Sequence, residues 1–306
     1  MDISIVSPVY QAEKIIDELV KNIIRSVSKL TDNFEIILVD DCSLDNSWAE
    51  IMKCCKTDKR VKGMKLSRNF GQQYAITAGL EASKGNFVVV MDCDLQDDPE
   101  YIPELYKKIN EGYDLVFTRM KKKSHSLSKR LYSKLFSVLF SWLSDSDFYN
   151  YNTNGFSILS RRVVESFCKV NDVHRHYLFI LKWLGYKHTY IEVSHRDRYA
   201  GESSYSFRKL CLHALNGIVS QSDKLLRLSI SLGFVFSFIS LFVLIVILAM
   251  YLFHGYKEGW ASIVCIILLS AGLILISNGV IGIYIGKIFE QVKNRPLYLV
   301  NERINI

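Results

Sequence analysis

Short apolar runs and amphipathic stretches alternate along most of the chain before residue 224. The apolar runs predict strands that are buried on both faces, and apolar residues spaced three and four apart predict helices between them. Strands are expected at residues 3–7, 34–39, 61–66, 87–91, 115–118 and 188–194, helices at 13–30, 74–82 and 100–110, and a short strand that runs into a helix at 152–161. This order predicts an α/β domain with a mostly parallel sheet.

The strand expected at 87–91 is followed directly by acidic residues, beginning with Asp92 and Asp94. Ligands of open α/β sheets bind beyond the carboxyl ends of the strands. The two carboxylates can therefore converge on a hard divalent cation, Mg2+ or Mn2+, with Gln96 as a neutral oxygen ligand. The alternative is a solvated acidic turn that Pro99 closes.

Two other expected strands also end in polar loops. The first ends in Pro8-Val9-Tyr10, where proline stops the ladder and the tyrosine can stack on a planar group. The second ends in Asp40 and Asp41, which can accept hydrogen bonds from a base imide or a ribose hydroxyl, or can cap the next helix. For Asp45 and Ser47, helix capping is the favoured interpretation.

Basic residues occupy two further loops of the predicted domain. Residues 67–72 contain Arg68, an amide and a glycine before a helix, which is typical either of an anion nest or of an ordinary surface loop. After the strand at 188–194, Arg196 and Arg198 precede Ser203. Arginine forks and hydroxyls suit a phosphate, and a solvated basic loop is the alternative.

The C-terminal third has a different composition. The chain has 306 residues, 49% of them hydrophobic, and a net charge of +7, but residues 230–253 and 261–285 contain no charge at all. A helix of 24 residues is ~36 Å long, enough to cross a hydrocarbon layer of about 30 Å. We therefore predict a domain at 1–223, a transmembrane hairpin at 224–288 and a cytoplasmic tail at 289–306.

Charge beside these segments predicts their orientation. Lys224 and Arg227 precede the first segment and Lys293 and Arg295 follow the second, whereas the connection 254–260 has one lysine and one glutamate. The positive-inside rule places both termini and the domain in the cytoplasm. A basic amphipathic helix is expected at about 125–143, either in the membrane interface or packed on the domain surface.

Cysteine spacing and the first residues agree with this location. The seven cysteines show no metal-binding spacing and are expected to be free thiols in a reducing compartment. The chain begins with a strand pattern, so no signal peptide is expected. Gly282 and Gly286 form a small-residue motif for helix packing, within the hairpin or between subunits, and Asn278 is a further packing feature.

Several motifs together resemble membrane-anchored polyprenyl-phosphate glycosyltransferases of glycosyltransferase family 2, of the dolichol-phosphate mannose synthase type. The layout is most similar to bacterial enzymes with two spans. The motifs are Pro8-Val-Tyr10, Val39-Asp-Asp41 with Ser43 and Asp45, Leu66-Ser-Arg-Asn-Phe-Gly71, Met91-Asp-Cys-Asp-Leu-Gln-Asp97 and Arg198-x-x-Gly201-x-Ser203. Each motif alone is weak, whereas the set is specific and extends over nearly the whole chain.

The resemblance implies a GT-A fold, a divalent cation and inverting transfer of a hexose or N-acetylhexosamine. The donor would be a nucleotide-diphosphate sugar, expected to be UDP-linked, and the acceptor a polyprenyl phosphate such as undecaprenyl phosphate. It implies a bacterial cytoplasmic-membrane protein that forms a homo-oligomer and binds no nucleic acid. Expected catalytic residues are Asp92, Asp94 and Arg198; expected substrate-binding residues are Pro8, Val9, Tyr10, Asp40, Asp41, Arg68, Arg119, Arg196 and Ser203; expected metal ligands are Asp92, Asp94 and Gln96.

Two positions depart from the family pattern. Ser204 stands where relatives usually have a lysine of the phosphate clamp, and Gly155 stands where many have an aspartate proposed as a base. A phosphate monoester has a second pKa of about 6, so the acceptor is already largely dianionic at cytoplasmic pH. Positioning and charge compensation, rather than a strong base, are therefore the expected basis of catalysis.

Two other functions remain open on the sequence. A processive polysaccharide synthase resembles this domain, but usually has a Gln-x-x-Arg-Trp motif, and none of the four tryptophans here follows an arginine. A non-catalytic nucleotide-binding membrane scaffold is the second alternative. The retained Asp92 and Asp94 argue against a scaffold, whereas Ser204 and Gly155 mildly favour it.

Overall fold

The computed structural model describes residues 1–120, 153–194, 224–254 and 259–306. It divides into two compact units, and each is treated by itself below. The first contains the N-terminal residues and the C-terminal end from Arg295, and the second contains two long helices. The amphipathic helix expected at about 125–143 lies outside the described residues, as does the basic loop with Arg196, Arg198, Ser203 and Ser204.

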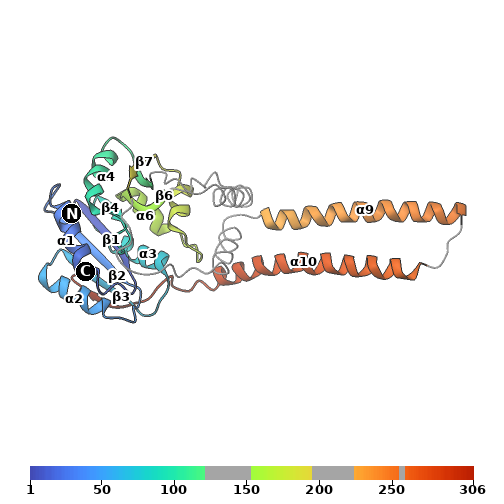
Figure 1. The fold of residues 1–306 in the computed structure, drawn as a ribbon, viewed down its shortest axis with the longest axis horizontal. Coiled ribbons are helices and arrows are strands. Elements are labelled where there is room, and N and C mark those ends of the chain that lie inside the picture. The colour runs from blue at the N-terminus through green and yellow to red at the C-terminus, as the bar shows by residue number, and fades with distance from the viewer. Residues whose placement is uncertain (121–152, 195–223, 255–258) are drawn as a thin grey trace. The chain divides into compact units, whose positions relative to one another are not determined.

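A sheet of eight strands forms the first unit (Figure 1). Its order is β7-β5-β6-β4-β1-β2-β3-β8, and the neighbouring strands β4, β1, β2 and β3 are parallel. β6 and β8 run antiparallel to their neighbours. The strands are β1 (Ile3–Val9), β2 (Phe34–Asp40), β3 (Val61–Leu66), β4 (Phe87–Val90), β5 (Leu115–Met120), β6 (Thr153–Ser160), β7 (His188–Val193) and β8 (Val300–Ile304).

Helices cover both faces of this sheet, which explains why its inner strands are mostly apolar. One face packs against α1 (Ile16–Val27), α2 (Ser47–Thr57) and α4 (Ile102–Ile109), the last preceded by the short turn η1 (Pro99–Tyr101). The other face packs against α3 (Gln72–Ala82), α6 (Arg161–Lys169) and α7 (Tyr177–Trp183). The predicted α/β class with a mostly parallel central sheet is confirmed.

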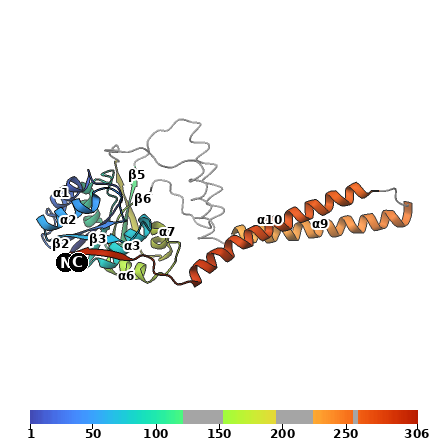
Figure 2. The same ribbon diagram turned by 90° about the horizontal axis from the view of Figure 1, so that it is seen from below.

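The sequence did not predict two of these elements, α7 and β8. β8 lies in the segment expected to be a tail, yet it pairs antiparallel with β3, with Gly63 opposite Ile304 and Lys65 opposite Glu302. Figure 2 shows this strand in red beside β3. The C-terminal residues are therefore an integral edge of the sheet.

The second unit contains α9 (Lys224–His254) and α10 (Trp260–Val292), of 31 and 33 residues. Both include windows that are long and apolar enough to cross a membrane, and no residue of either window is buried. Many large apolar side chains on these helices are exposed, for example Phe234, Phe242 and Leu275. The helices contact each other through a hydrogen bond of 3.0 Å between the hydroxyls of Ser229 and Ser277.

Candidate active site

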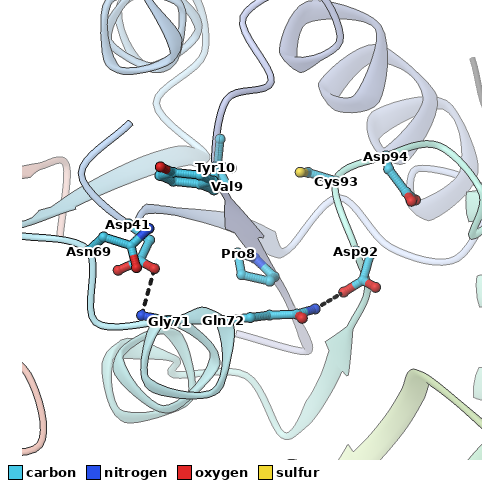
Figure 3. A pocket seen from close by; sticks show the side chains of 10 residues that line it. All are labelled: Pro8, Val9, Tyr10, Asp41, Asn69, Gly71, Gln72, Asp92, Cys93 and Asp94. Carbon is cyan, nitrogen blue, oxygen red and sulfur yellow. Dashed lines mark hydrogen bonds between the residues drawn. The ribbon is translucent and has the colours of Figure 1, made fainter. Parts of the chain in front are cut away.

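A pocket of about 340 Å³ opens at the carboxyl ends of β1, β2 and β4 (Figure 3). Because these strands are parallel and adjacent, their following loops meet at one edge of the sheet. Three loop residues there, Gln11, Cys42 and Leu95, have positive φ angles, which non-glycine residues seldom adopt. The lining residues are Pro8, Val9, Tyr10, Asp41, Asn69, Gly71, Gln72, Asp92, Cys93 and Asp94.

Asp41 forms one end of the pocket. It is only 2% exposed, and its carboxylate accepts hydrogen bonds from the backbone N–H groups of Phe70 at 2.7 Å and Gly71 at 2.8 Å. Gly71 has a φ of +106°, a conformation that favours glycine. Burial raises the pKa of Asp41, although the two N–H donors oppose this effect. Two N–H groups of the predicted anion nest thus bind a carboxylate of the protein itself.

Asp92 and Asp94 form the other end of the pocket. The side-chain amide of Gln72 donates to Asp92 at 2.6 Å, and the backbone N–H of Gln96 donates to Asp94 at 3.1 Å. The backbone N–H of Asp92 donates to Asp97, which closes the acidic loop. Burial and, secondarily, the charge of Asp94 raise the pKa of Asp92 to about 6. Two like charges therefore repel each other beside an open pocket.

These two carboxylates suit a divalent cation. Carboxylate oxygens are hard ligands for Mg2+ or Mn2+, and a cation would offset the burial and the repulsion by Asp94 that together raise the pKa of Asp92. Within the described ranges, no three His, Cys, Asp or Glu residues cluster as a metal site. Mg2+ commonly uses one or two carboxylates together with substrate phosphates and water, so a pair is sufficient.

Tyr10 and Cys93 complete the pocket wall. Tyr10 is 43% exposed, which leaves its ring accessible to a planar ligand. Burial raises the pKa of the Cys93 thiol to about 12, so this cysteine is protonated at neutral pH and unsuited to nucleophilic chemistry. The pocket thus combines an accessible aromatic ring, a buried acceptor and a pair of carboxylates.

The structure separates the predicted site residues into two groups. Pro8, Val9, Tyr10, Asp41, Asp92 and Asp94 line the pocket, whereas Asp40, Arg68, Gln96 and Arg119 are not among the lining residues. Asp40 is fully buried and accepts from the backbone N–H of Ser43, so it shapes the turn after β2. Arg68 stacks over Phe70, with its guanidinium carbon 4.4 Å from the ring centroid.

Arg119 lies within β5 rather than after it. Its guanidinium carbon is 4.2 Å from the ring centroid of Tyr190 on the neighbouring strand. Its Nε is buried and has no hydrogen-bond partner among the residues described. The role expected of Arg119 in phosphate binding is untested and remains a prediction.

Helix capping was expected of Asp45 and Ser47, but the N-cap residue of α2 is Asn46, which has no side-chain capping hydrogen bond. Asp45 accepts from the backbone N–H and the hydroxyl of Ser47, the first residue of α2. The Ser47 hydroxyl accepts from the N–H of Ala12 and the other Asp45 oxygen accepts from the N–H of Glu13. These residues therefore tie the start of α2 to the loop after β1.

Sequence reasoning missed the roles of Asn69, Gln72 and Cys93 in this pocket. The loop 67–72 was recognised for its basic and small residues, but a contact between Gln72 and Asp92 joins positions 20 apart in the chain. Nothing in the local pattern specifies such a contact.

Fold and site together define an α/β protein of the GT-A-like type. A crystal structure of glucosyl-3-phosphoglycerate synthase from Mycobacterium tuberculosis, in complex with Mn2+ and uridine-diphosphate-glucose, has a similar fold, with a TM-score of 0.50 and 18% sequence identity. The match covers 72% of this chain and 77% of that chain. The family model described as glycosyl transferase family 2 matches residues 4–169, and the chain belongs to this family.

Two relatives are similar along nearly the whole chain. An uncharacterized glycosyltransferase of Bacillus subtilis, YkcC, is 35% identical over 305 residues, covering 99% of this chain and 94% of its own. An undecaprenyl-phosphate 4-deoxy-4-formamido-L-arabinose transferase of Shewanella sediminis is 32% identical over 306 residues, covering 98% of this chain and 92% of its own. The similarity therefore includes the two C-terminal helices as well as the domain.

Proposed function

We propose that the protein transfers a sugar from a nucleotide-diphosphate sugar to a polyprenyl phosphate, such as undecaprenyl phosphate, with inversion at the anomeric carbon. The proposal depends on one observation: the same chain contains a pocket with paired carboxylates and two helices long enough to span a membrane. Relatives named for transfer to undecaprenyl phosphate, similar over nearly the full length, support the choice of acceptor.

The pocket accounts for binding of the donor. Tyr10 offers a ring on which a base can stack, and Asp41 offers a buried acceptor for an imide or a hydroxyl. Pro8 and Val9 form part of the same pocket wall. We expect a UDP-linked hexose or N-acetylhexosamine. Asp92 and Asp94 would then lie beside the diphosphate.

Asp92 and Asp94 would hold a Mg2+ or Mn2+ ion, with Gln96 as a third oxygen ligand. A bound cation supplies positive charge to the diphosphate oxygens as the nucleotide departs. Gln72 orients Asp92, and the backbone of Gln96 orients Asp94, so the protein itself fixes the direction of both carboxylates.

Positioning of the acceptor explains catalysis without a strong base. A lipid phosphate is largely dianionic at neutral pH, because its second pKa is about 6. Arg119, with a buried and unpaired Nε in the part of the protein that the structure describes, would bind phosphate, together with Arg68, Arg196, Arg198 and Ser203. These groups would reduce repulsion between acceptor and donor and align the acceptor oxygen with the anomeric carbon.

The membrane arrangement follows from α9, α10 and β8. We propose that both helices span the bacterial cytoplasmic membrane, with the domain and both termini in the cytoplasm. Because β8 pairs with β3, the chain must return to the side of the membrane from which it started. Two crossings satisfy this condition and one does not. The basic residues beside the helices favour the cytoplasm as that side.

We also propose a homo-oligomer held partly by α10. Among the described residues, a Cβ added at Gly282 or Gly286 would meet no atom within 4 Å, so this small-residue face is open toward them. Such faces commonly pack helices closely in membranes. Crosslinking in membranes of a variant with Gly282→Cys should yield a dimer band, which Gly233→Cys on α9 should not.

Lipid extraction tests the activity. Membranes containing the protein are incubated with radiolabelled nucleotide sugars and undecaprenyl phosphate. We expect label in a small acid-labile lipid, dependent on Mg2+ or Mn2+ and lost with a chelator. Label in a polymer would indicate a processive synthase, and absence of label with every donor would indicate a nucleotide-binding scaffold.

A further inference from the structure

The last nine residues of the chain include β8, the edge strand of the sheet. This strand pairs with β3, and β3 leads into the loop that lines the pocket. β8 itself has exposed or partly exposed residues along its length, so apolar burial contributes little to its pairing. Main-chain hydrogen bonds to β3 and a few side chains hold it instead. Tyr298, Val300 and Ile306 pack at the margin of one core and Ile304 at the margin of the other.

Side-chain hydrogen bonds at two positions hold the C-terminal segment against the domain. The indole N–H of Trp48 on α2 donates to Glu302 at 3.1 Å. The amide of Asn305 donates to the carbonyls of Cys55 and Val61, both at 2.9 Å. These bonds join the chain end to α2 and to the first residue of β3, which fixes the register of β8.

The same segment contacts both flanks of the loop that lines the pocket. On the entering side, the backbone N–H of Ser67, directly after β3, donates to the carbonyl of Leu299 at 2.9 Å. Beyond the loop, the hydroxyl of Tyr298 donates to Glu81, near the C-terminal end of α3, the helix that begins at Gln72. The C-terminal segment thus holds the loop 68–71 directly at Ser67 and, through α3, holds the helix that follows it.

This loop determines the geometry of the pocket. Its backbone N–H groups at Phe70 and Gly71 hold the carboxylate of Asp41, and Asn69 and Gly71 line the cavity. A loop that is fixed before binding costs less conformational entropy on binding. Whatever fixes the loop therefore raises the affinity of the pocket for its ligand.

We propose that residues 298–305 position the loop 67–72 and thereby set the affinity of the pocket for the nucleotide. The inference rests on the proposed function only in taking the ligand to be a nucleoside diphosphate. Tyr298, Glu302 and Asn305 are positioning residues, since they act through the loop. The segment that follows the membrane hairpin is in this way part of the donor site.

The test uses the full chain in detergent with the substitutions Tyr298→Phe, Glu302→Ala and Asn305→Ala combined. We expect the Kd for uridine diphosphate with Mg2+ to rise about tenfold, and the KM for the sugar donor to rise with it, while kcat changes less than twofold. Lys56→Ala is the control, because Lys56 is exposed on α2 and lies outside residues 298–305.

Hydrogen exchange of the β8 amides reports whether the segment has detached. Detachment with a Kd within twofold of the unsubstituted protein overturns the proposal. If the amides stay protected, the segment has not detached, and a variant that lacks residues 298–306 is used instead. A rise of about tenfold in its Kd for uridine diphosphate supports the proposal, and a Kd within twofold overturns it. Addition of a peptide of residues 297–306 should restore affinity to the deletion variant. Failure of the unsubstituted protein to bind uridine or guanosine diphosphate would instead refute the proposed function.

Discussion

The two edges of the sheet use carboxylates in opposite ways. At the amino edge, Glu35 on β2 is fully buried and accepts from the Ser4 hydroxyl at 2.6 Å and from the N–H of Lys84 at 2.7 Å. Its second oxygen is 2.6 Å from the ammonium group of Lys62. At the carboxyl edge, Asp92 and Asp94 lie beside each other at an open pocket.

The pKa values of these groups shift in opposite directions. Burial raises the pKa of Glu35, but hydrogen bonds from Lys62, Ser4 and Lys84 outweigh it, and the net pKa is lowered. Burial and the charge of Asp94 raise the pKa of Asp92 to about 6. Glu35 is compensated by Lys62, whereas no cationic partner of Asp92 is found among the residues that the structure describes. A ligand that supplies positive charge is therefore expected at one edge and not at the other.

Removal of Asp94 should give the largest functional effect. Asp94→Ala is expected to lower sugar transfer by ~10³-fold or more, because half of the carboxylate pair is lost. The thermal midpoint of the domain should remain close to that of the unsubstituted protein, since the side chain lines a pocket. The lipid-extraction assay and thermal unfolding measure the two quantities.

Glu104→Ala is the matched control for Asp94→Ala, because Glu104 is an exposed acid on α4. It should leave both transfer and thermal midpoint unchanged. Full activity of Asp94→Ala would refute the assignment of the cation site.

Removal of Glu35 should instead destabilise the fold. Glu35→Ala leaves Lys62 buried without its partner, for which the expected loss is ~3–5 kcal/mol of unfolding free energy. Urea unfolding followed by tryptophan fluorescence measures the loss. The double variant with Lys62→Met should recover much of it, because the uncompensated charge is then removed. If Glu35→Ala and the double variant had the same unfolding free energy, Glu35 and Lys62 would not be a coupled ion pair.

The contribution of Glu35 should also depend on pH. Its folded-state pKa is lowered from the ordinary value of 4.5, so its stabilising effect is complete above that value and is lost as pH falls through the folded-state pKa. The difference in unfolding free energy between the unsubstituted protein and Glu35→Gln should be constant from pH 7 to 5.5 and shrink below 4.5. Urea titrations at several pH values measure this difference, and a constant difference down to pH 3 would contradict the shift.

Gly155 offers the smallest expected effect and tests whether a base is needed. A Cβ at Gly155 on β6 would meet no atom of the described residues within 4 Å, so Gly155→Asp should fold normally. Because the acceptor is already dianionic, transfer is expected to change by less than about threefold. A rise of a hundredfold would show that this position supplies a missing base. Gly155→Asn, with the same shape and no charge, is the control.

The sequence by itself determined the alternation of strands and helices, the acid at the ends of β2 and β4, and the two long apolar helices. These features are local, since strand and helix periodicity and apolar length are read within a few residues. The pocket residues Tyr10, Asp41, Asp92 and Asp94 could be found because parallel strands bring their ends to one edge.

Only the tertiary structure separated Asp40 from Asp41, both of which were expected from the sequence to bind substrate. Successive residues at a strand end face opposite sides, so one lines the pocket and the other is buried in the turn. The tertiary structure also decided the pairing of β8 with β3 and the contact of Gln72 with Asp92. A five-residue edge strand with exposed polar residues has too little apolar pattern to predict its partner, because its main-chain hydrogen bonds depend on where β3 lies rather than on its own side chains.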